Sequence, residues 1–276
     1  MKTLRRTLCT ALMALGLATP AVAQEMPPLP QSIRAPGVLR AGVRCDQPPY
    51  GFRGPDGGFA GVEVDMARQM AVWAFGSADK IELSCVTAEN RIPQLNSRRV
   101  DFLIATLGVT PDRARVIDFS EPYRWGGSDM LVRRDSPIRR LDDVANRTVI
   151  MLRGSTQAQW FEQNMPNLNA LRLNTASDAL QALMQGRGDA YAHDAATLVV
   201  VAARDPSLRL VGEAFSVSDA AVGVRKNEAE WLAWVNAALA RMKRENLFNT
   251  WLERWVPAET RPFYSSSFNE PRPQAR

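Results

Sequence analysis

The segment IELSCVTAENRIPQLNSRRVDFLIAT, residues 81–106, decides the fold class because it contains one complete strand–helix–strand unit. Its apolar patterns predict strands at Ile81–Val86 and Val100–Thr106 and a helix at Glu89–Arg98 between them. Two strands joined through a helix are typical of parallel neighbours in one sheet. The segment therefore predicts an α/β protein.

The same alternation continues along most of the chain. Further strands are expected at Val38–Arg44, Thr148–Leu152, Ala170–Leu173 and Asp189–His193. Further helices are expected at Gly61–Phe75, Arg140–Ala145, Thr156–Asn164, Ala176–Gln185, Glu228–Arg244 and Leu247–Val256. This order favours parallel sheets with helices on both faces. The tail from Glu259, rich in Pro, Ser and Arg, is expected to be irregular.

A weak internal repeat indicates two similar halves. The pattern Leu-x-x-x-Arg-x-Asp begins at Leu95, where an expected helix ends and a strand starts, and it returns at Leu183 in the same context. About 250 residues with 46% hydrophobic content can form one large domain or two of ordinary size. The repeat favours two α/β lobes over one large sheet.

The first 23 residues have the three parts of a secretory signal. A head with three cations precedes the apolar run Leu8–Leu17, and small residues at Ala21 and Ala23 flank Val22. The apolar run is too short to cross a bilayer. We therefore expect a signal peptide at residues 1–23, export to the periplasm, and a mature chain that starts near Gln24.

Charge argues against a nucleic-acid partner. The formal net charge of +5 falls to +2 when residues 1–23, which hold three cations and no anion, are removed. The remaining positive charge is scattered along the chain and forms no basic run.

Two cysteines remain after the expected signal, Cys45 and Cys85. Both lie at the ends of expected strands that could be parallel neighbours. In an oxidising compartment such a pair can form a disulfide, and the alternative is two buried thiols. A disulfide closing this loop would stabilise the protein by roughly 2–5 kcal/mol.

The sequence shows no catalytic constellation. His193 is the only histidine, and no serine stands in a nucleophile elbow that could use it. The sequence also lacks metal-ligand spacings, a phosphate-binding GxxxxGK and a GxGxxG after a strand. We therefore expect no cofactor, no metal site and no enzyme activity.

Charged residues instead follow the expected strands, where open α/β sheets place their ligand crevices. Arg44, Arg91 and Arg113 follow the first three strands, and Asp194 ends a strand of the second half. Gly154-Ser155-Thr156 forms a strand-to-helix junction whose free N–H groups favour an anion. Three cations and one carboxylate match the charges of an amino acid with an acidic side chain.

The chain also resembles the periplasmic amino-acid-binding proteins of ABC importers, the family-3 solute-binding proteins, from about Gly37 to Trp255. Five segments carry the resemblance, in the family's order: LRAGVRCDQPPYGF, GGFAGVEVDMARQMA, TPDRARVIDFSEPY, LRGST and GRGDAYAHD. They resemble the proline-aromatic turn, the GxxxGFDVDLA helix start, TPERxxxxDFSxPY, the anion turn of the second lobe and the GRVDAxxxD strand.

The resemblance implies a type II periplasmic-binding-protein fold with two mostly parallel, helix-flanked sheets and two hinge crossovers. Residues 24–129 and 221–276 would form the first lobe and residues 130–220 the second, with crossovers near Asp129–Val132 and Ala220–Gly223. The lobes would close around an amino acid and present it to a membrane ABC permease, and the protein would act as a monomer.

The resemblance also implies roles for single residues. Arg113 would grip the ligand α-carboxylate with a two-pronged ion pair, and Thr156 at the Ser155 junction would clamp it from the other lobe. Asp194 would take the α-ammonium group. Thr106 and Gly108 match positions that hydrogen-bond the ligand, although Gly108 offers only its backbone.

Selectivity would depend on Arg44 and Arg91, which resemble the basic residues of acidic-amino-acid binders. Binders of cationic amino acids carry an acid near the first strand's end, and we interpret Asp46 there as a turn residue. Glutamate or aspartate is the expected ligand, with glutamine or asparagine next. Tyr50 would form part of the cleft wall.

Each of these residues has a structural alternative. Arg113 could pair with Asp112 or Asp118, Arg44 and Arg91 could face solvent, Asp194 could cap a helix, and Tyr50 could pack in the core.

Two other functions also stay open. A dehydratase of the cyclohexadienyl type resembles this fold but needs a second acid after Asp194, where this chain has Ala195 and Ala196. A sensory ligand-binding module is the other.

Overall fold

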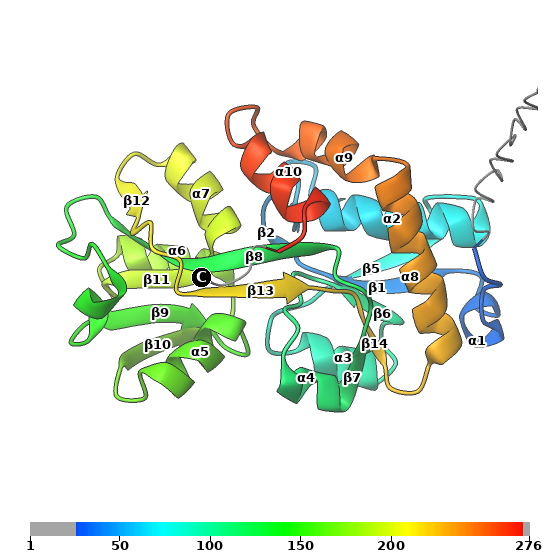
Figure 1. The fold of residues 1–276 in the computed structure, drawn as a ribbon, viewed down its shortest axis with the longest axis horizontal. Coiled ribbons are helices and arrows are strands. Elements are labelled where there is room, and N and C mark those ends of the chain that lie inside the picture. The colour runs from blue at the N-terminus through cyan, green and yellow to red at the C-terminus, as the bar shows by residue number, and fades with distance from the viewer. Residues whose placement is uncertain (1–25, 273–276) are drawn as a thin grey trace, which may run out of the picture.

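The computed structural model describes residues 26–272, and it contains two α/β lobes side by side, each built on its own sheet (Figure 1). We name each lobe by the order in which the chain enters it. The expected α/β class with helix-flanked sheets is confirmed. The expected signal peptide lies outside the described residues.

The first lobe holds a five-stranded sheet in the order β5-β1-β6-β14-β7. The bounds are β1 (Leu39–Val43), β5 (Ile81–Cys85), β6 (Phe102–Ile104), β7 (Ile117–Phe119) and β14 (Gly223–Arg225). Both β5 and β6 are parallel to β1, which lies between them, so the two strands of the opening segment share a sheet as expected but are not neighbours. Strand β14 pairs antiparallel with β6 and β7. A three-stranded sheet, β2 (Asp46–Gln47), β3 (Gly51–Arg53) and β4 (Phe59–Ala60), adjoins it.

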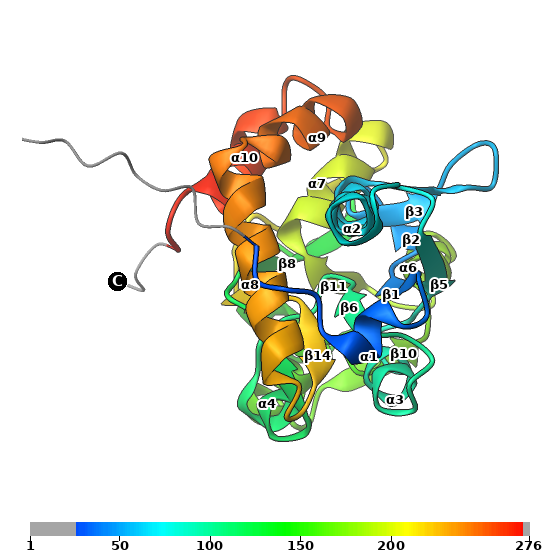
Figure 2. The same cartoon turned by 90° about the vertical axis from the view of Figure 1, so that its right-hand side faces the viewer.

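Helices cover both faces of the first sheet, and α2 and α3 lie on opposite sides of it (Figures 1 and 2). The helices of this lobe are α1 (Gln31–Arg34), α2 (Val62–Phe75), α3 (Arg91–Asn96), α4 (Pro111–Val116), α8 (Ala229–Arg244), α9 (Leu247–Trp255) and α10 (Arg261–Asn269). One large apolar core joins β1 and β6 to α2, α8 and α9.

The second lobe holds a sheet in the order β10-β9-β11-β8-β12, with β13 paired to β8. The strands are β8 (Arg124–Arg133), β9 (Thr148–Leu152), β10 (Asn169–Leu173), β11 (Ala190–Asp194), β12 (Leu208–Leu210) and β13 (Ser216–Ala220). The helices are α5 (Thr156–Asn164), α6 (Ala176–Met184), α7 (Ala195–Arg204) and the 3₁₀ turn η1 (Leu141–Val144).

Side-chain alternation along the strands builds two cores in the second lobe. Val149 and Met151 of β9 pack with α5, whereas Ile150 and Leu152 pack with α6 and α7 on the opposite face. This two-residue period follows from strand geometry, in which neighbouring side chains point to opposite faces. Both faces are thus apolar, as expected for a sheet covered on two sides.

The chain passes from the first sheet to the second between β7 and β8, after Phe119 and before Arg124, and returns between Ala220 and Gly223. The first crossover therefore precedes Asp129–Val132, which lie within β8 and pair with β11 and β12. The long strand β8 starts beside the first lobe and ends inside the second. The division of the chain at residues 129 and 220 stays a prediction.

The expectation of an irregular tail is wrong, because residues 261–269 form α10. The helix packs on α9 and β8 and buries Tyr264 and Phe268. The Tyr264 hydroxyl also donates a hydrogen bond to the carbonyl of Ala196, in α7 of the second lobe. The tail therefore contacts both lobes.

Cys45 and Cys85 form a disulfide with a Cα–Cα distance of 5.5 Å, which lies in the usual range for such bonds. The parallel register of β1 and β5 pairs Val43 with Cys85, so the bridge joins neighbouring strands at their carboxyl ends.

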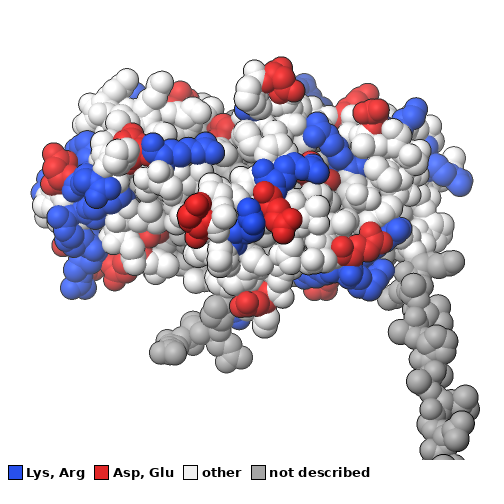
Figure 3. All heavy atoms as spheres, turned by 90° about the horizontal axis from the view of Figure 1, so that it is seen from above, with Lys and Arg blue, Asp and Glu red and all other residues white. Residues whose placement is uncertain are grey.

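Across residues 26–272, we find no helix long and apolar enough to cross a membrane. The face drawn in Figure 3 carries acidic and basic side chains interspersed, with basic ones densest at the end of the second lobe. That no nucleic acid binds stays a prediction.

Candidate functional site: a charged cavity between the lobes

A small cavity lies between the two lobes, where β1, β9 and β11 end. Its volume is about 20 Å³, which is enough for about one water molecule. Its lining includes six of the residues predicted from the sequence: Arg44, Arg91, Thr106, Ser155, Thr156 and Asp194. An amino acid needs several times this space.

Arg113 links the two lobes beside this cavity. Its Nη1 donates to the carbonyl of Gly108 at 2.6 Å, and its Nη2 donates to the carbonyl of Gly154 in the second lobe at 2.8 Å. Thr110 caps α4 by accepting a hydrogen bond from the Arg113 N–H, which fixes the start of the helix. Burial lowers the pKa of Arg113 to about 10, so the guanidinium stays charged at neutral pH.

The surface alternative for Arg113 is not what the structure shows. Asp112 pairs with Arg115 at 3.1 Å, and Asp118 pairs with Lys226 at 2.7 Å. Within the described part of the chain no carboxylate lies within ion-pair distance of Arg113.

Arg91 is buried in the first turn of α3. Its Nη1 donates to the carbonyls of Ala105 at 2.7 Å and Thr106 at 3.3 Å, and its Nε has no partner within residues 26–272. Burial, followed by repulsion from Arg113 and Arg44, lowers the pKa of Arg91 well below its usual value. The surroundings therefore destabilise the positive charge of Arg91, and a bound anion would stabilise it.

Arg44 is buried at the end of β1, and its Nη2 donates to Asp46 Oδ1 at 2.7 Å. The other oxygen of Asp46 accepts the N–H of Ala176, at the start of α6 in the second lobe, at 2.7 Å. Asp46 thus forms an ion pair with Arg44 and accepts a hydrogen bond from the N-terminus of α6, where a negative charge is stabilised.

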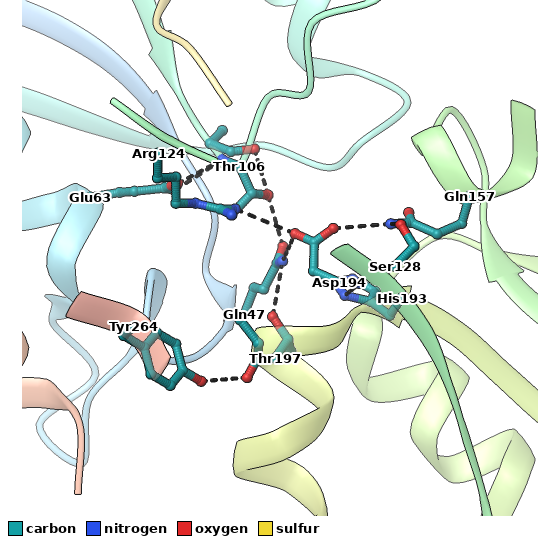
Figure 4. A network of polar contacts seen from close by, with 12 residues as sticks. Gln47, Glu63, Thr106, Arg124, Ser128, Gln157, His193, Asp194, Thr197 and Tyr264 are labelled. Carbon is teal, nitrogen blue, oxygen red and sulfur yellow. Dashed lines mark hydrogen bonds and ion pairs between the residues drawn. The ribbon is translucent and has the colours of Figure 1, made fainter. Parts of the chain in front are cut away.

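Asp194 stands at the centre of a polar network drawn from both lobes (Figure 4). Its Oδ1 accepts from Gln157 Nε2 at 3.0 Å, and its Oδ2 accepts from Gln47 Nε2 at 3.3 Å and Arg124 Nη2 at 3.4 Å. Burial acts to raise the pKa of Asp194, but His193, Arg124 and the Gln157 hydrogen bond together lower it. Burial lowers the pKa of His193, whose Nδ1 accepts the N–H of Asp194 at 2.8 Å.

Thr106 and Gly108 hold the turn after β6. Thr106 adopts a positive φ of 48°, its N–H donates to the buried carboxylate of Glu63 at 3.0 Å, and its hydroxyl donates to Gln47 Oε1 at 3.0 Å. A Cβ added at Gly108 would meet Thr156 Cγ2 at 2.8 Å. A side chain at position 108 would therefore press on Thr156 of the second lobe, and glycine avoids this contact.

Ser155 and Thr156 begin α5 under the cavity. The Ser155 hydroxyl accepts the N–H of Ala158 at 3.1 Å and so caps the helix. The junction is formed as predicted, with Gly154 at a positive φ of 67° before it.

Tyr50 is fully buried and does not line the cavity. Its ring packs against Tyr264 and Phe268, with centroid distances of 6.1 and 6.4 Å. The guanidinium of Arg124 lies over its other side, 4.2 Å from the ring centroid. The sequence left open whether Tyr50 forms part of the cleft wall or packs in the core, and the structure supports core packing.

Sequence reasoning missed the three side chains that donate to the Asp194 carboxylate: Gln47, Arg124 and Gln157. Each lies next to a segment that the sequence marks, within CDQPPY, directly after SEPY and directly after GST. Adjacency was the only available signal, because glutamine and arginine are common on surfaces.

Known proteins resemble this chain along most of its length. The family of bacterial extracellular solute-binding proteins, family 3, matches residues 39–258. The glutamine-binding protein of Geobacillus stearothermophilus is 35% identical, over 71% of this chain and 76% of that protein. The L-cystine-binding protein of Escherichia coli is 29% identical, over 82% of this chain and 85% of that protein.

Solved structures show the same fold. The solute receptor for L-cysteine of Neisseria gonorrhoeae superposes with a TM-score of 0.79 and 30% identity, covering 82% of this chain and 92% of that one. An ancestral arginine-binding protein bound to glutamine gives a TM-score of 0.74 and 30% identity, covering 80% and 98%. The chain has the type II periplasmic-binding-protein fold and belongs to the family-3 bacterial extracellular solute-binding proteins.

Proposed function

We propose that this protein captures an acidic amino acid, glutamate or aspartate, outside the cytoplasm and delivers it to an ABC importer. Glutamine and asparagine are the next candidates. Relatives named for glutamine, glutamate and cystine support an amino-acid ligand, and the family's extracellular character supports export. A monomer and a membrane permease as partner belong to the same proposal.

The observation that carries the acidic ligand is a pair of cations without a counter-ion: Arg91, which lines the cavity, and Arg113, which does not line it but contacts Gly154 at the start of α5. Neither Arg91 nor Arg113 has a carboxylate within ion-pair distance in residues 26–272. Their guanidinium groups donate instead to backbone carbonyls. A carboxylate is a stronger acceptor than a carbonyl for a planar guanidinium, because it offers two charged oxygens in matching geometry.

Each cation has a separate carboxylate in this proposal. Arg113 takes the α-carboxylate, helped by the N–H groups at the start of α5, and Arg91 takes the side-chain carboxylate. Arg44 is less available, because Asp46 holds its Nη2. A lysine or arginine ligand would bring a third cation toward two that are already uncompensated, so the charge balance disfavours it.

In this proposal, closure of the two lobes around the ligand provides much of the binding affinity. Arg113 and Gly154 come from different lobes and are 2.8 Å apart, so a ligand bound there must contact both lobes. Exclusion of water from this region strengthens each ion pair. Only a ligand that engages both lobes can favour the closed form.

A thermal-shift screen tests the proposal. The purified protein is heated with each of the twenty amino acids in turn, and a bound ligand raises the melting temperature by mass action, equivalent to about 2.7 kcal/mol at a concentration of 100 times Kd. We expect glutamate or aspartate to give the largest shift. A response limited to lysine and arginine would refute the acidic preference, and no response to any amino acid would refute the proposed function.

A further inference from the structure

Arg124 is a buried cation whose position no role assigned so far explains. It begins β8, the strand that joins the lobes, and its side chain is 4% exposed. The guanidinium lies over the Tyr50 ring, and its Nη2 reaches Asp194 Oδ2 at 3.4 Å (Figure 4). The neighbouring sequence makes room for it, because a Cβ at Gly126 would meet Arg124 Nη1 at 2.8 Å.

Asp194 is therefore largely satisfied by the protein itself. Gln157 donates to one of its oxygens, and Gln47 and Arg124 donate to the other. The ion pair with Arg124 is partly buried, with the Arg124 side chain 4% and the Asp194 side chain 21% exposed, and charges attract more strongly there than in open water. A ligand ammonium arriving at Asp194 would meet a carboxylate whose charge is already balanced.

The balance of charges around the cavity also disfavours a ligand ammonium. Two guanidinium groups have carboxylate partners, Arg44 with Asp46 and Arg124 with Asp194. Behind this layer, Glu63 accepts from the Tyr123 hydroxyl and the Thr106 N–H. Even with Glu63 ionised, the guanidinium groups of this region, which also include Arg91 and Arg113, outnumber its carboxylates, so the site attracts negative charge more than it attracts an ammonium.

We propose that Arg124 is a specificity-determining residue that takes the place of a ligand ammonium at Asp194, so that the site accepts short dicarboxylates with or without an α-amino group. The inference rests on the proposed function, because it uses the same cavity and the same carboxylate clamps. It widens the ligand class from acidic amino acids to dicarboxylates of four or five carbons that need not carry an α-amino group.

The first test compares two ligands that differ only in the amino group. Isothermal titration calorimetry measures Kd for L-glutamate and for glutarate with the purified wild-type protein. We expect the two values to agree within about tenfold, because the ammonium finds a carboxylate that is already paired. A larger preference for glutamate would overturn the inference and leave the proposed function standing.

The second test changes Arg124. In Arg124→Gln the unpaired carboxylate of Asp194 should attract the glutamate ammonium and repel glutarate, so the ratio of the two Kd values should rise by about 30-fold or more. Arg124→Lys keeps the charge and should keep a ratio near that of the wild type. Arg172→Gln, which removes an exposed cation paired with Glu162, is the matched control.

Three outcomes separate the possibilities. A ratio that rises in Arg124→Gln but not in Arg124→Lys or Arg172→Gln supports the inference. An equal loss of affinity for both ligands in Arg124→Gln, with an unchanged ratio, overturns it. Absence of binding of glutamate, glutarate and glutamine to the wild type refutes the proposed function itself. If Arg124→Gln does not fold, the wild-type comparison still decides.

Discussion

Replacing Arg113 with alanine is the most direct test of the clamp. Its two terminal nitrogens contact Gly108 at 2.6 Å and Gly154 at 2.8 Å, so the group that would grip a ligand carboxylate also joins the lobes. Hydrogen bonds to charged groups contribute about 1.5–3 kcal/mol each. Removing one partner of a buried charge pair costs about 2–5 kcal/mol.

Arg113→Ala should therefore weaken binding of L-glutamate at least about 30-fold, the factor that corresponds to 2 kcal/mol. Arg113→Lys should also bind weakly, because a single ammonium cannot form the two-pronged contact. The control is Arg115→Ala, on the same helix, whose side chain is 76% exposed. Calorimetry that gave Arg113→Ala an affinity within threefold of the wild type would refute the assignment.

Three further predictions follow from single contacts. Gly108→Ala places a Cβ 2.8 Å from Thr156 Cγ2, which should hold the lobes apart at a cost of about 1–3 kcal/mol; an unchanged Kd for L-glutamate would show that the contact yields. Burial lowers the pKa of His193. Below the unfolded value of about 6.5, the unfolded state therefore binds more protons than the folded state, and the free energy of unfolding decreases as the pH is lowered, by at most about 1.4 kcal/mol per pH unit. His193→Gln, which removes the only histidine, should flatten the decline in melting temperature between pH 7 and 5, and parallel curves would contradict this. Removing the disulfide by Cys45→Ser with Cys85→Ser should cost about 2–5 kcal/mol in denaturant unfolding, whereas a loss under 1 kcal/mol would mean that the bridge contributes little.

The sequence predicted those parts of the site that depend on strand ends. Arg44, Arg91 and Asp194 were expected together because the carboxyl ends of parallel strands share one edge of a sheet, and the structure places all three on one cavity. Apolar patterns alone were enough for this step, since they fix where each strand stops.

Other parts of the fold depend on contacts that no local pattern reveals. Helix α7 has the sequence AATLVVVAAR, an apolar run rich in valine without an obvious helical stripe. It nevertheless forms a helix that packs against β8 and β12. Helix α10 lies in a tail rich in serine and proline, and it is stabilised by burial of Tyr264 and Phe268. In both segments tertiary packing overrides a weak local preference.

The same distinction explains why Arg124 was missed. An arginine after a proline-tyrosine pair gives no sign of burial in the sequence. Its environment is assembled from Gly126 on the same strand and from Tyr50 and Asp194, which come from distant parts of the chain. Only the folded chain brings a ring, a vacant Cβ position and a carboxylate around one guanidinium.

The contacts between the lobes are of two kinds, and this difference predicts how the cavity opens. On one side, the lobes meet through polar contacts, Arg113 with Gly154 and Gln159 with Asp112. Two further polar contacts, Asp46 with Ala176 and Gln47 with Asp194, also join the lobes. On the other side, Tyr264 of α10 donates to Ala196 of α7, and both residues belong to the apolar core of the first lobe. A net hydrogen bond is worth about 0.5–1.5 kcal/mol, whereas a buried aromatic or aliphatic side chain is worth about 1.5–3 kcal/mol.

We therefore expect the lobes to separate at the polar side and to pivot at the contact between α7 and α10. Spin labels at Asp112 and Gln159 should move apart when ligand is removed, whereas labels at Arg204 and Phe263, on α7 and α10, should keep their distance. If the second pair separates as far as the first, the helical contact is no pivot, and α10 serves only to cover the core of the first lobe.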